Sequence, residues 1–287
     1  MTTQNLSDSV RRNCKHHQTL VVVMWCVCCC IAVSASAQDP AKASVQESTG
    51  SADVAAKPAD EKPVERRRKS YLGRVVAQPM SHVGAPWLIR PERDSEENVT
   101  DSYKALQIQP GMVVCDLGCG NGFWTLPMAK DVGEKGLVYA VDIQREMLNK
   151  LQYRASQEEL SNIRPTLGKV DDPKLPVDEI DLLLMVDVYH EFSHPQSMLW
   201  EIRRSLKPTG VVALLEYREE DPTVPIKLLH KMSKRQIMKE YEANGFKLVR
   251  EYNELPWQHL MFFARDDSPL DAVSPVPAGE VLKALGN

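Results

Sequence analysis

The sequence predicts an α/β fold, a doubly wound sheet of seven strands that is mostly parallel and has an antiparallel last strand. Three observations lead to this prediction. Short apolar runs alternate with amphipathic segments over residues 108–265, the pattern of helices packed on a buried parallel sheet. The first apolar run leads directly into a series of glycines. The last two apolar runs have no helix between them, so we expect them to be antiparallel neighbours.

The first strand is predicted over residues 112–116. Pro110-Gly111 precedes it, and a short apolar run bounded by such turn residues is typical of a strand buried on both faces. Gly118, Gly120 and Gly122 follow. Glycines permit positive φ angles and leave no Cβ in the way, so a ligand can lie against the backbone where a helix begins. We therefore interpret this stretch as a cofactor loop.

The other strands are predicted from short runs of mostly apolar residues bounded by turn residues. Gly133 and Gly136 precede the second strand, Gly210 opens the fifth, and Pro256 lies between the last two. These strands are expected at residues 137–141, 163–167, 180–186, 211–217, 246–252 and 259–264.

The helices are predicted from apolar residues at helical spacing and from end signals. The first begins after the glycines and contains Pro127, which a helix tolerates best in its first turn. Ser233 and Gln236 form a capping box for the last helix, and Gly245 stands where it should end. The apolar faces lie in residues 123–130, at Met147, Leu148 and Leu151, at Met198, Leu199, Ile202 and Leu206, and at Ile237 and Tyr241.

Composition limits the classes of function. The 287-residue chain has a formal net charge of −4, so it offers no basic footprint for nucleic acid, and we expect no nucleic-acid partner. All cysteines except Cys115 and Cys119 lie in the first thirty residues. The folded part therefore has too few cysteines for a disulfide framework.

The N-terminus has the features of a signal peptide. Arg11-Arg12 and Lys15 precede an apolar run at residues 20–33, and Ala35-Ser36-Ala37 supplies small residues for cleavage. We expect a Sec-type signal over residues 1–37 and export to the periplasm or cell envelope. The alternatives are an uncleaved membrane anchor, which would be the chain's only membrane contact, and a cytoplasmic protein.

Three further segments flank the main domain of residues 108–265. Residues 38–69 are poor in large apolar side chains, which predicts a disordered linker, and the basic run 66–69 in it is interpreted as a solvated charge run. Residues 70–107 are expected to form an N-terminal lid segment and a helix that leads into the sheet. Residues 266–287 are expected to be a loose C-terminal tail.

The glycine loop lacks one feature of a nicotinamide site. Phe123 occupies the place of the third glycine in the dinucleotide fingerprint. The order of a strand, Asp116 and then Gly-x-Gly-x-Gly instead resembles the first motif of the class I S-adenosylmethionine-dependent methyltransferases, which have a Rossmann-like fold. The resemblance continues through Val141-Asp142, Asp171-Asp172, Leu175-Pro176 and the segment after Leu206-Lys207-Pro208.

This resemblance implies S-adenosylmethionine as the cofactor. Asp142, at the end of the second strand and about 20 residues past the glycines, is where nucleoside-binding folds place an acid for the ribose hydroxyls, although it could serve NAD or cap a helix. An acid after the third strand would meet the adenine amino group, or be an ordinary turn residue. The expected cofactor-binding residues are Asp116, Gly118, Gly120, Asn121, Asp142, Ile143, Asp171, Asp172 and Asp187.

The segment Asp187–Phe192 follows the fourth strand and faces the crevice where such sheets bind ligands. His190 or Glu191 could act as a catalytic base, and the ring of Tyr189 could lie against the sulfonium charge. Alternatively, Tyr189 is packing and His190 or Glu191 caps the helix after Pro195. The expected substrate contacts are His82, Trp87 and Arg90 in the lid segment, together with His230 and His259.

We predict no metal site. His190 and His194 have i, i+4 spacing, but Pro195 interrupts any helix that would align them. Cys115 and Cys119 span a strand and a turn, which does not suit a zinc site.

The expected function is therefore direct, in-line methyl transfer from S-adenosylmethionine to a small-molecule acceptor. One alternative is a domain that binds S-adenosylmethionine or S-adenosylhomocysteine without catalysis. A less favoured one is an NAD-dependent oxidoreductase.

Overall fold

A computed structural model of the chain describes residues 62–286. The expected signal peptide and residues 38–61 of the expected linker lie outside this range. None of the helices in the described residues combines the length and the apolar character needed to cross a membrane.

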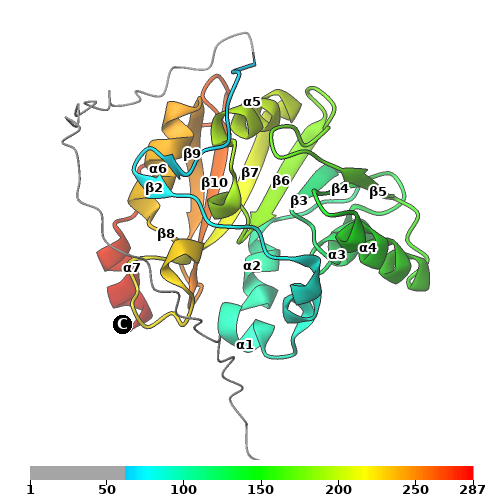
Figure 1. The fold of residues 1–287 in the computed structure, drawn as a ribbon, viewed down its shortest axis with the longest axis horizontal. Helices are drawn as coiled ribbons and strands as arrows, with labels where there is room; N and C mark the ends of the chain where they lie inside the picture. The colour runs from blue at the N-terminus through cyan, green and yellow to red at the C-terminus, as the bar shows by residue number, and fades with distance from the viewer. Residues whose placement is uncertain (1–61, 287) are drawn as a thin grey trace, which may run out of the picture. The chain divides into compact units, whose positions relative to one another are not determined.

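The predicted sheet is confirmed (Figure 1). Its strand order is β5-β4-β3-β6-β7-β10-β9, and the two-residue strand β8 pairs with β7, so the sheet has eight strands instead of seven. β10 is antiparallel to β7 and β9, and the other pairs are parallel. The strands are β3 (Val113–Leu117), β4 (Leu137–Asp142), β5 (Ile163–Leu167), β6 (Ile180–Val186), β7 (Leu206–Arg218), β8 (Lys231–Met232), β9 (Phe246–Tyr252) and β10 (Gln258–Arg265).

Helices cover both faces of this sheet. On one face, α5 (Pro195–Ser205) and α6 (Lys234–Ala243) bury apolar side chains such as Ile202 and Tyr241. On the other face, α3 (Thr125–Val132) contributes Met128 and Val132 to a second cluster. α4 (Arg145–Gln157) adds Leu148 and Leu151 to a third. Because α3 begins at Thr125, Pro127 falls in its first turn, as predicted.

The segment before the sheet contains more elements than the single helix predicted. Asn98 adopts a left-handed φ of 52°, and its side chain accepts a hydrogen bond from the backbone of Asp101. This residue ends one helix and caps the next. The elements are β1 (Ser70–Tyr71), β2 (Arg74–Val75), the 3₁₀ helix η1 (His82–Ile89), α1 (Arg93–Glu97) and α2 (Val99–Ala105).

Two flanking segments differ from the expectation of disorder. Within residues 62–69, the backbone N–H of Arg68 donates to Ser193 O at 2.8 Å, and a side-chain oxygen of Glu65 accepts from the backbone of Ser197 at 3.0 Å. The C-terminal segment contains α7 (Ala278–Leu285), whose Val281 is buried. Tertiary contacts therefore hold segments that lack apolar runs of their own.

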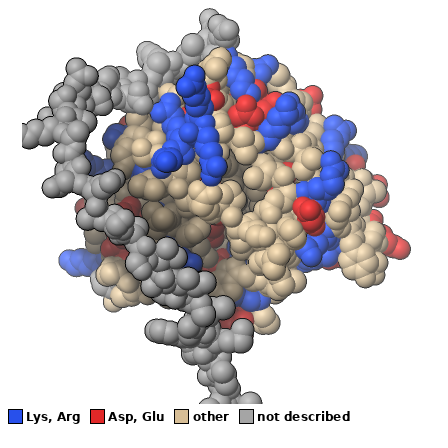
Figure 2. All heavy atoms as spheres, viewed as in Figure 1, with Lys and Arg blue, Asp and Glu red and all other residues tan. Residues whose placement is uncertain are grey.

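Arg66, Arg67 and Lys69 in the basic run are exposed. Figure 2 shows lysine and arginine side chains gathered on the face that this N-terminal segment crosses.

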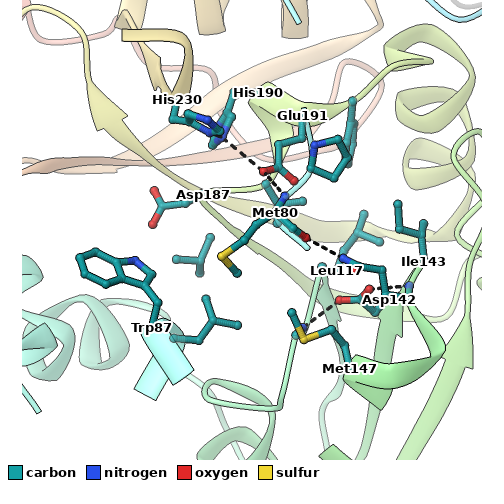
Figure 3. A pocket seen from close by; sticks show the side chains of 18 of the residues that line it. Met80, Trp87, Leu117, Asp142, Ile143, Met147, Asp187, His190, Glu191 and His230 are labelled. Carbon is teal, nitrogen blue, oxygen red and sulfur yellow. Dashed lines mark hydrogen bonds and ion pairs between the residues drawn. The ribbon is translucent and has the colours of Figure 1, made fainter. Parts of the chain in front are cut away.

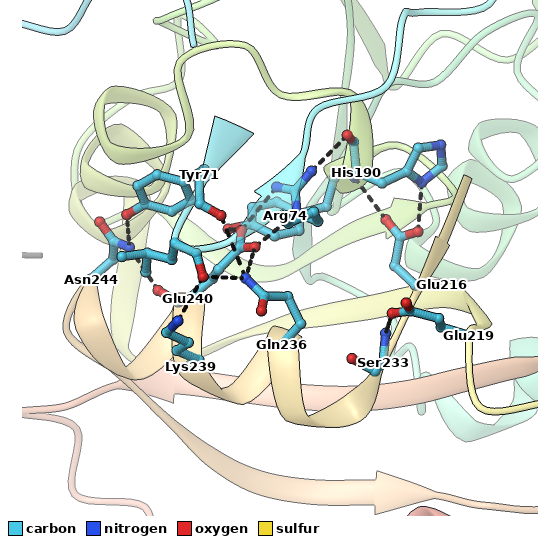
Figure 4. A network of polar contacts seen from close by, with 12 residues as sticks. Tyr71, Arg74, His190, Glu216, Glu219, Ser233, Gln236, Lys239, Glu240 and Asn244 are labelled. Atoms are coloured by element: carbon cyan, nitrogen blue, oxygen red, sulfur yellow. Dashed lines mark hydrogen bonds and ion pairs between the residues drawn. The ribbon is translucent and has the colours of Figure 1, made fainter. Parts of the chain in front are cut away.

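A buried ion pair joins the hairpin β1–β2 to α6 (Figure 4). Arg74 donates to both carboxylate oxygens of Glu240, at 2.8 and 2.9 Å, and Glu240 is fully buried. Tyr189, in the 3₁₀ helix η2 (Tyr189–Glu191), donates to the same carboxylate at 2.7 Å. Arg74 also donates to the carbonyl oxygen of His190 at 2.8 Å. The hairpin thus fixes the backbone of η2.

This pair gives a stability prediction. Arg74→Ala leaves the Glu240 carboxylate buried without its cation, so we expect the free energy of unfolding to fall by about 3 kcal/mol. The control is Arg67→Ala, because Arg67 is exposed and donates to the side chain of Gln78 at the surface. This substitution should lower the free energy of unfolding by less than about 0.5 kcal/mol. Urea unfolding followed by circular dichroism measures both. Equal losses in the two variants would contradict the anchoring role.

Candidate functional site

A cavity of about 670 Å³ opens at the carboxyl ends of the central strands (Figure 3). β3 lies between β4 and β6, so the direction in which the strand order proceeds reverses there, the point at which open α/β sheets bind ligands. η1, η2 and the 3₁₀ helix η3 (Leu228–His230) also contribute to its walls.

The glycine loop forms a cradle with no room for side chains. Gly118 and Gly120 have φ angles of 78° and 52° and line the cavity. A Cβ at Gly118 would lie 2.4 Å from Val188 Cγ2, and one at Gly120 would lie 2.6 Å from Leu88 Cδ1. Both positions therefore favour glycine, and the backbone itself lines the cavity there.

Asp142 lies at the end of β4 and lines the same cavity. Its carboxylate accepts hydrogen bonds from the backbone N–H groups of Gly120 at 3.0 Å and Gln144 at 2.8 Å. Burial raises its pKa. These two bonds leave lone pairs on both oxygens, so the carboxylate can accept from a diol.

The side chain of Gln144 ties the lid segment to this strand end. Its oxygen accepts from the backbone N–H of His82 at 2.8 Å, and its nitrogen donates to Met80 O at 2.8 Å. The lid segment is thereby held over the end of β4.

A group of acids occupies another part of the wall. Asp187 accepts two hydrogen bonds from Gln258, and burial together with the charge of Glu97 raises its pKa well above the usual value. Glu97 is bonded by Arg90 and Arg93 at 2.6 and 2.7 Å. Asp187 and Glu97 both line the cavity, so a bound ligand can form hydrogen bonds with them.

His190 and three other side chains form a polar cluster on the cavity wall. The Nδ1–H of His190 donates to the fully buried Glu216 at 2.7 Å. Nε2 lies 3.0 Å from Nδ1 of His230 and 3.9 Å from Oε1 of Glu191. The three groups that line the cavity, His190, Glu191 and His230, face one another there (Figure 3).

The members of the cluster alter one another's pKa values. Burial lowers the pKa of His190, but the charges of Glu216 and Glu191 outweigh this effect, so the pKa lies above its ordinary value. Burial raises the pKa of Glu191 to about 7. Burial and the neighbouring His190 lower the pKa of His230. Such groups suit proton transfer at physiological pH.

Comparison with known proteins decides the family. A family model described as a methyltransferase domain matches residues 108–260. The chain belongs to this methyltransferase family. The cradle of Gly118 and Gly120 and the free lone pairs of Asp142 fit a nucleoside cofactor, and the cofactor is S-adenosylmethionine, as the sequence predicted.

Individual relatives support the assignment. Two proteins named demethylmenaquinone methyltransferase, from Geobacillus sp. (strain WCH70) and Shouchella clausii, are each 28% identical to the chain over 58% and 55% of its length. The chain spans 68% and 65% of these relatives. A crystal structure of a SAM-dependent methyltransferase from Aquifex aeolicus is 26% identical in sequence and has a TM-score of 0.60. The matched region covers 64% of this chain and 98% of the Aquifex aeolicus chain.

The cavity of this methyltransferase brings together most of the residues expected at the end of β6 and in the lid segment. The expected site residues that line it are Gly118, Gly120, Asp142, Ile143 and Asp187 for the cofactor, His190 and Glu191 for catalysis, and Trp87, Arg90 and His230 for the substrate.

Other expected cofactor and catalytic residues lie off the cavity. Asp116 is buried beneath the loop and accepts from Thr125 Oγ1 at 2.5 Å, and burial raises its pKa to about 7. Asn121 donates to Ala85 O at 3.0 Å. Tyr189 is fully buried and bonded to Glu240, so packing directs its ring into the core.

The remaining expected residues do not line the cavity either. Asp172 accepts from the backbone of Lys174, and neither it nor Asp171 lines the cavity, whose wall there is Lys169 and Val170. His82 contributes its backbone N–H to Gln144. His259 is fully buried on β10 and lies 2.9 Å from Glu220.

Sequence reasoning missed several residues of the site. Glu216 has a visible signal, because it is an acid near the end of an otherwise apolar strand. Gln144 lies two residues past the predicted ribose acid. Met80, Glu97 and Arg93 have no such signal, since only the folding of the lid segment over the sheet brings them to the cavity.

The cofactor assignment predicts the effect of two acids. Asp142→Ala should weaken S-adenosylmethionine binding by roughly 1.5 to 3 kcal/mol, because hydrogen bonds to a charged acceptor are lost. Asp171→Ala is the control and should change the affinity little, since Asp171 lies off the cavity. Isothermal titration calorimetry measures both, with NAD as a ligand that should not bind. An equal loss in the two variants would contradict the role given to Asp142.

Proposed function

We propose that this methyltransferase methylates a small, largely apolar acceptor by direct in-line transfer, and that the cluster of His190, Glu191 and Glu216 promotes loss of the acceptor's proton. The observation that carries the proposal is the position of this cluster. His190 and Glu191 line the same cavity as the glycine cradle, so a bound acceptor can reach both. Glu216 is buried behind His190 and accepts from its ring.

Apolar side chains support an apolar acceptor. Met80, Leu88 and Met198 line the cavity. Trp87, Ile143 and Val170 also line it and are 51%, 43% and 45% exposed, so the cavity presents several apolar side chains together, as ligand-binding surfaces do.

The relatives suggest the chemical class of the acceptor. Their names say that they methylate demethylmenaquinone, a quinone. We propose for this chain an aromatic acceptor of the hydroquinone type, the reduced form of a quinone, which carries ring hydroxyls. Deprotonation of a ring hydroxyl would make its oxygen or a neighbouring ring carbon nucleophilic.

The cofactor, the polar cluster and the lid segment have separate roles in the proposed reaction. S-adenosylmethionine supplies an electrophilic methyl group when bound. Glu216 fixes the ring of His190 so that Nε2 faces Glu191 and His230, where the acceptor's proton can be taken up. The lid segment, tied down by Gln144, excludes water and orients the acceptor.

Two variants test the cluster. His190→Gln and Glu191→Gln should leave S-adenosylmethionine affinity nearly unchanged and lower turnover by roughly 10²- to 10⁴-fold, the usual range for general acid–base catalysis. The control is His194→Gln, because His194 contacts Ser193 and does not line the cavity. Transfer of label from S-adenosylmethionine to a panel of hydroquinones and phenols gives the rates.

Two outcomes would count against this proposal. If a protein that carries both substitutions transfers label at the rate of the natural protein, positioning of the acceptor alone accounts for the reaction. If S-adenosylmethionine binds tightly and neither the panel nor cell extracts accept label, a non-catalytic binding domain is the better interpretation.

We also propose that the protein is exported, on the basis of its basic, apolar and small-residue N-terminal regions. The mature chain should begin at Gln38, because Ala35-Ser36-Ala37 ends the apolar region. N-terminal sequencing of protein from its own cells measures this. A membrane-bound chain that begins near Met1 would instead support the anchor, and a soluble one would support a cytoplasmic location.

A further inference from the structure

Three side chains with metal-binding atoms meet on the cavity wall. His190 and Glu191 belong to η2, and His230 belongs to η3, forty residues further along the chain. One ligand atom from each lies within 4.8 Å of the other two. His230 is too far from His190 in the sequence for residue spacing to predict this group, unlike His194.

We propose that His190, Glu191 and His230 form a binding site for a divalent transition metal ion. The three side chains line the cavity, so an ion held between them would keep an open coordination position toward the acceptor. Three protein ligands with an open position are typical of catalytic zinc sites, whereas structural sites are closed by four. The role of the ion in the reaction rests on the function proposed above, but its binding does not.

The separations of the ligand atoms suit a metal ion. With metal–nitrogen bonds of about 2.0–2.1 Å, tetrahedral geometry places ligand atoms roughly 3.3 Å apart. The distances from His190 Nε2 are 3.0 Å to His230 Nδ1 and 3.9 Å to Glu191 Oε1. Small side-chain rotations would bring all three atoms to bonding distance.

The surroundings of His190 strengthen the proposal. Histidines that bind metals commonly donate their other ring N–H to a carboxylate, which fixes the ring and its tautomer. Glu216 accepts from His190 Nδ1 at 2.7 Å and from its backbone N–H at 3.2 Å, and it is fully buried. This arrangement presents the lone pair of Nε2 to the cavity side of the ring.

The ligand types select the class of metal. Two imidazoles and one carboxylate suit Zn²⁺, Fe²⁺ or Co²⁺, whereas Mg²⁺ and Ca²⁺ prefer oxygen ligands. Glu216 accepts the Nδ1–H of His190 and lies directly behind this ligand, and a carboxylate in that position favours a bound cation.

A bound ion would change how the acceptor loses its proton. A ring hydroxyl bound at the open position would release its proton to water, because the cation stabilises the oxyanion. The acceptor would then form a bond to the methyl carbon while the carbon–sulfur bond breaks and its electron pair stays on sulfur. His190 would serve as a ligand in this state and not as the base.

The experiment measures metal binding without methyl transfer. The protein is freed of metal with a chelator and titrated with Co²⁺, whose visible absorption reports nitrogen and oxygen ligands, and with Zn²⁺ by calorimetry. We expect one ion per chain and no competition from Mg²⁺. Glu191→Gln and His230→Ala should each weaken binding at least 10-fold, whereas His194→Ala, four residues beyond His190 and off the cavity, should not.

Folding of the variants is checked through S-adenosylmethionine affinity, which both should retain because the substitutions leave Asp142 and the glycine cradle unchanged. Absence of Co²⁺ and Zn²⁺ binding, or equal binding in these variants and the natural protein, would overturn the site. Metal binding by a protein that methylates no acceptor would leave the site standing and overturn the proposed function instead.

Discussion

The arrangement of the cavity depends on one buried carboxylate. Glu216 lies on β7 among apolar neighbours and has no exposed surface, and an ionised group in such a place is costly unless it is hydrogen-bonded. His190 meets this requirement with its ring N–H and its backbone N–H. The 3₁₀ turn that follows β6 must therefore lie against β7, and the orientation of the imidazole is set by the core before any ligand binds.

A second buried charge holds the same turn from the opposite side. Arg74 pairs with Glu240 of α6 and also donates to the carbonyl oxygen of His190. Tyr189, which we expected near the cofactor, instead bonds Glu240 and packs on Tyr241. The side chains of two adjacent residues thus point in different directions: Tyr189 packs in the core and fixes the turn, and His190 faces the cavity. The N-terminal hairpin is for this reason part of the site's support.

The fold could be predicted from the sequence because its signals are local. Strands buried on both faces are continuous apolar runs, and Gly118, Gly120 and Asp142 belong to the site because they follow strand ends. Side-chain direction is not local. Asp172, His259 and Tyr189 are the right types of residue in the right segments, but contacts with Lys174, Glu220 and Glu240 turn them away. The break at Asn98 and the helix α7 have local signals that the prediction did not use: Asn98 caps α2 through the backbone of Asp101, and residues 278–285 are mostly strong helix formers that end before Gly286.

The polar cluster shows why residue spacing alone is a poor guide to such sites. The two-residue strand β8 pairs with β7 in parallel, with Tyr217 opposite Lys231. In this register the residue before Lys231, His230, comes beside the residue before Tyr217, Glu216. Since Glu216 also bonds His190, the short pairing brings Nε2 of His190 to 3.0 Å from Nδ1 of His230. A strand too short to recognise in the sequence therefore completes the cluster. A proton or a metal ion bound there is held by η2 and η3, two segments that are far apart in the sequence and are brought together by the sheet.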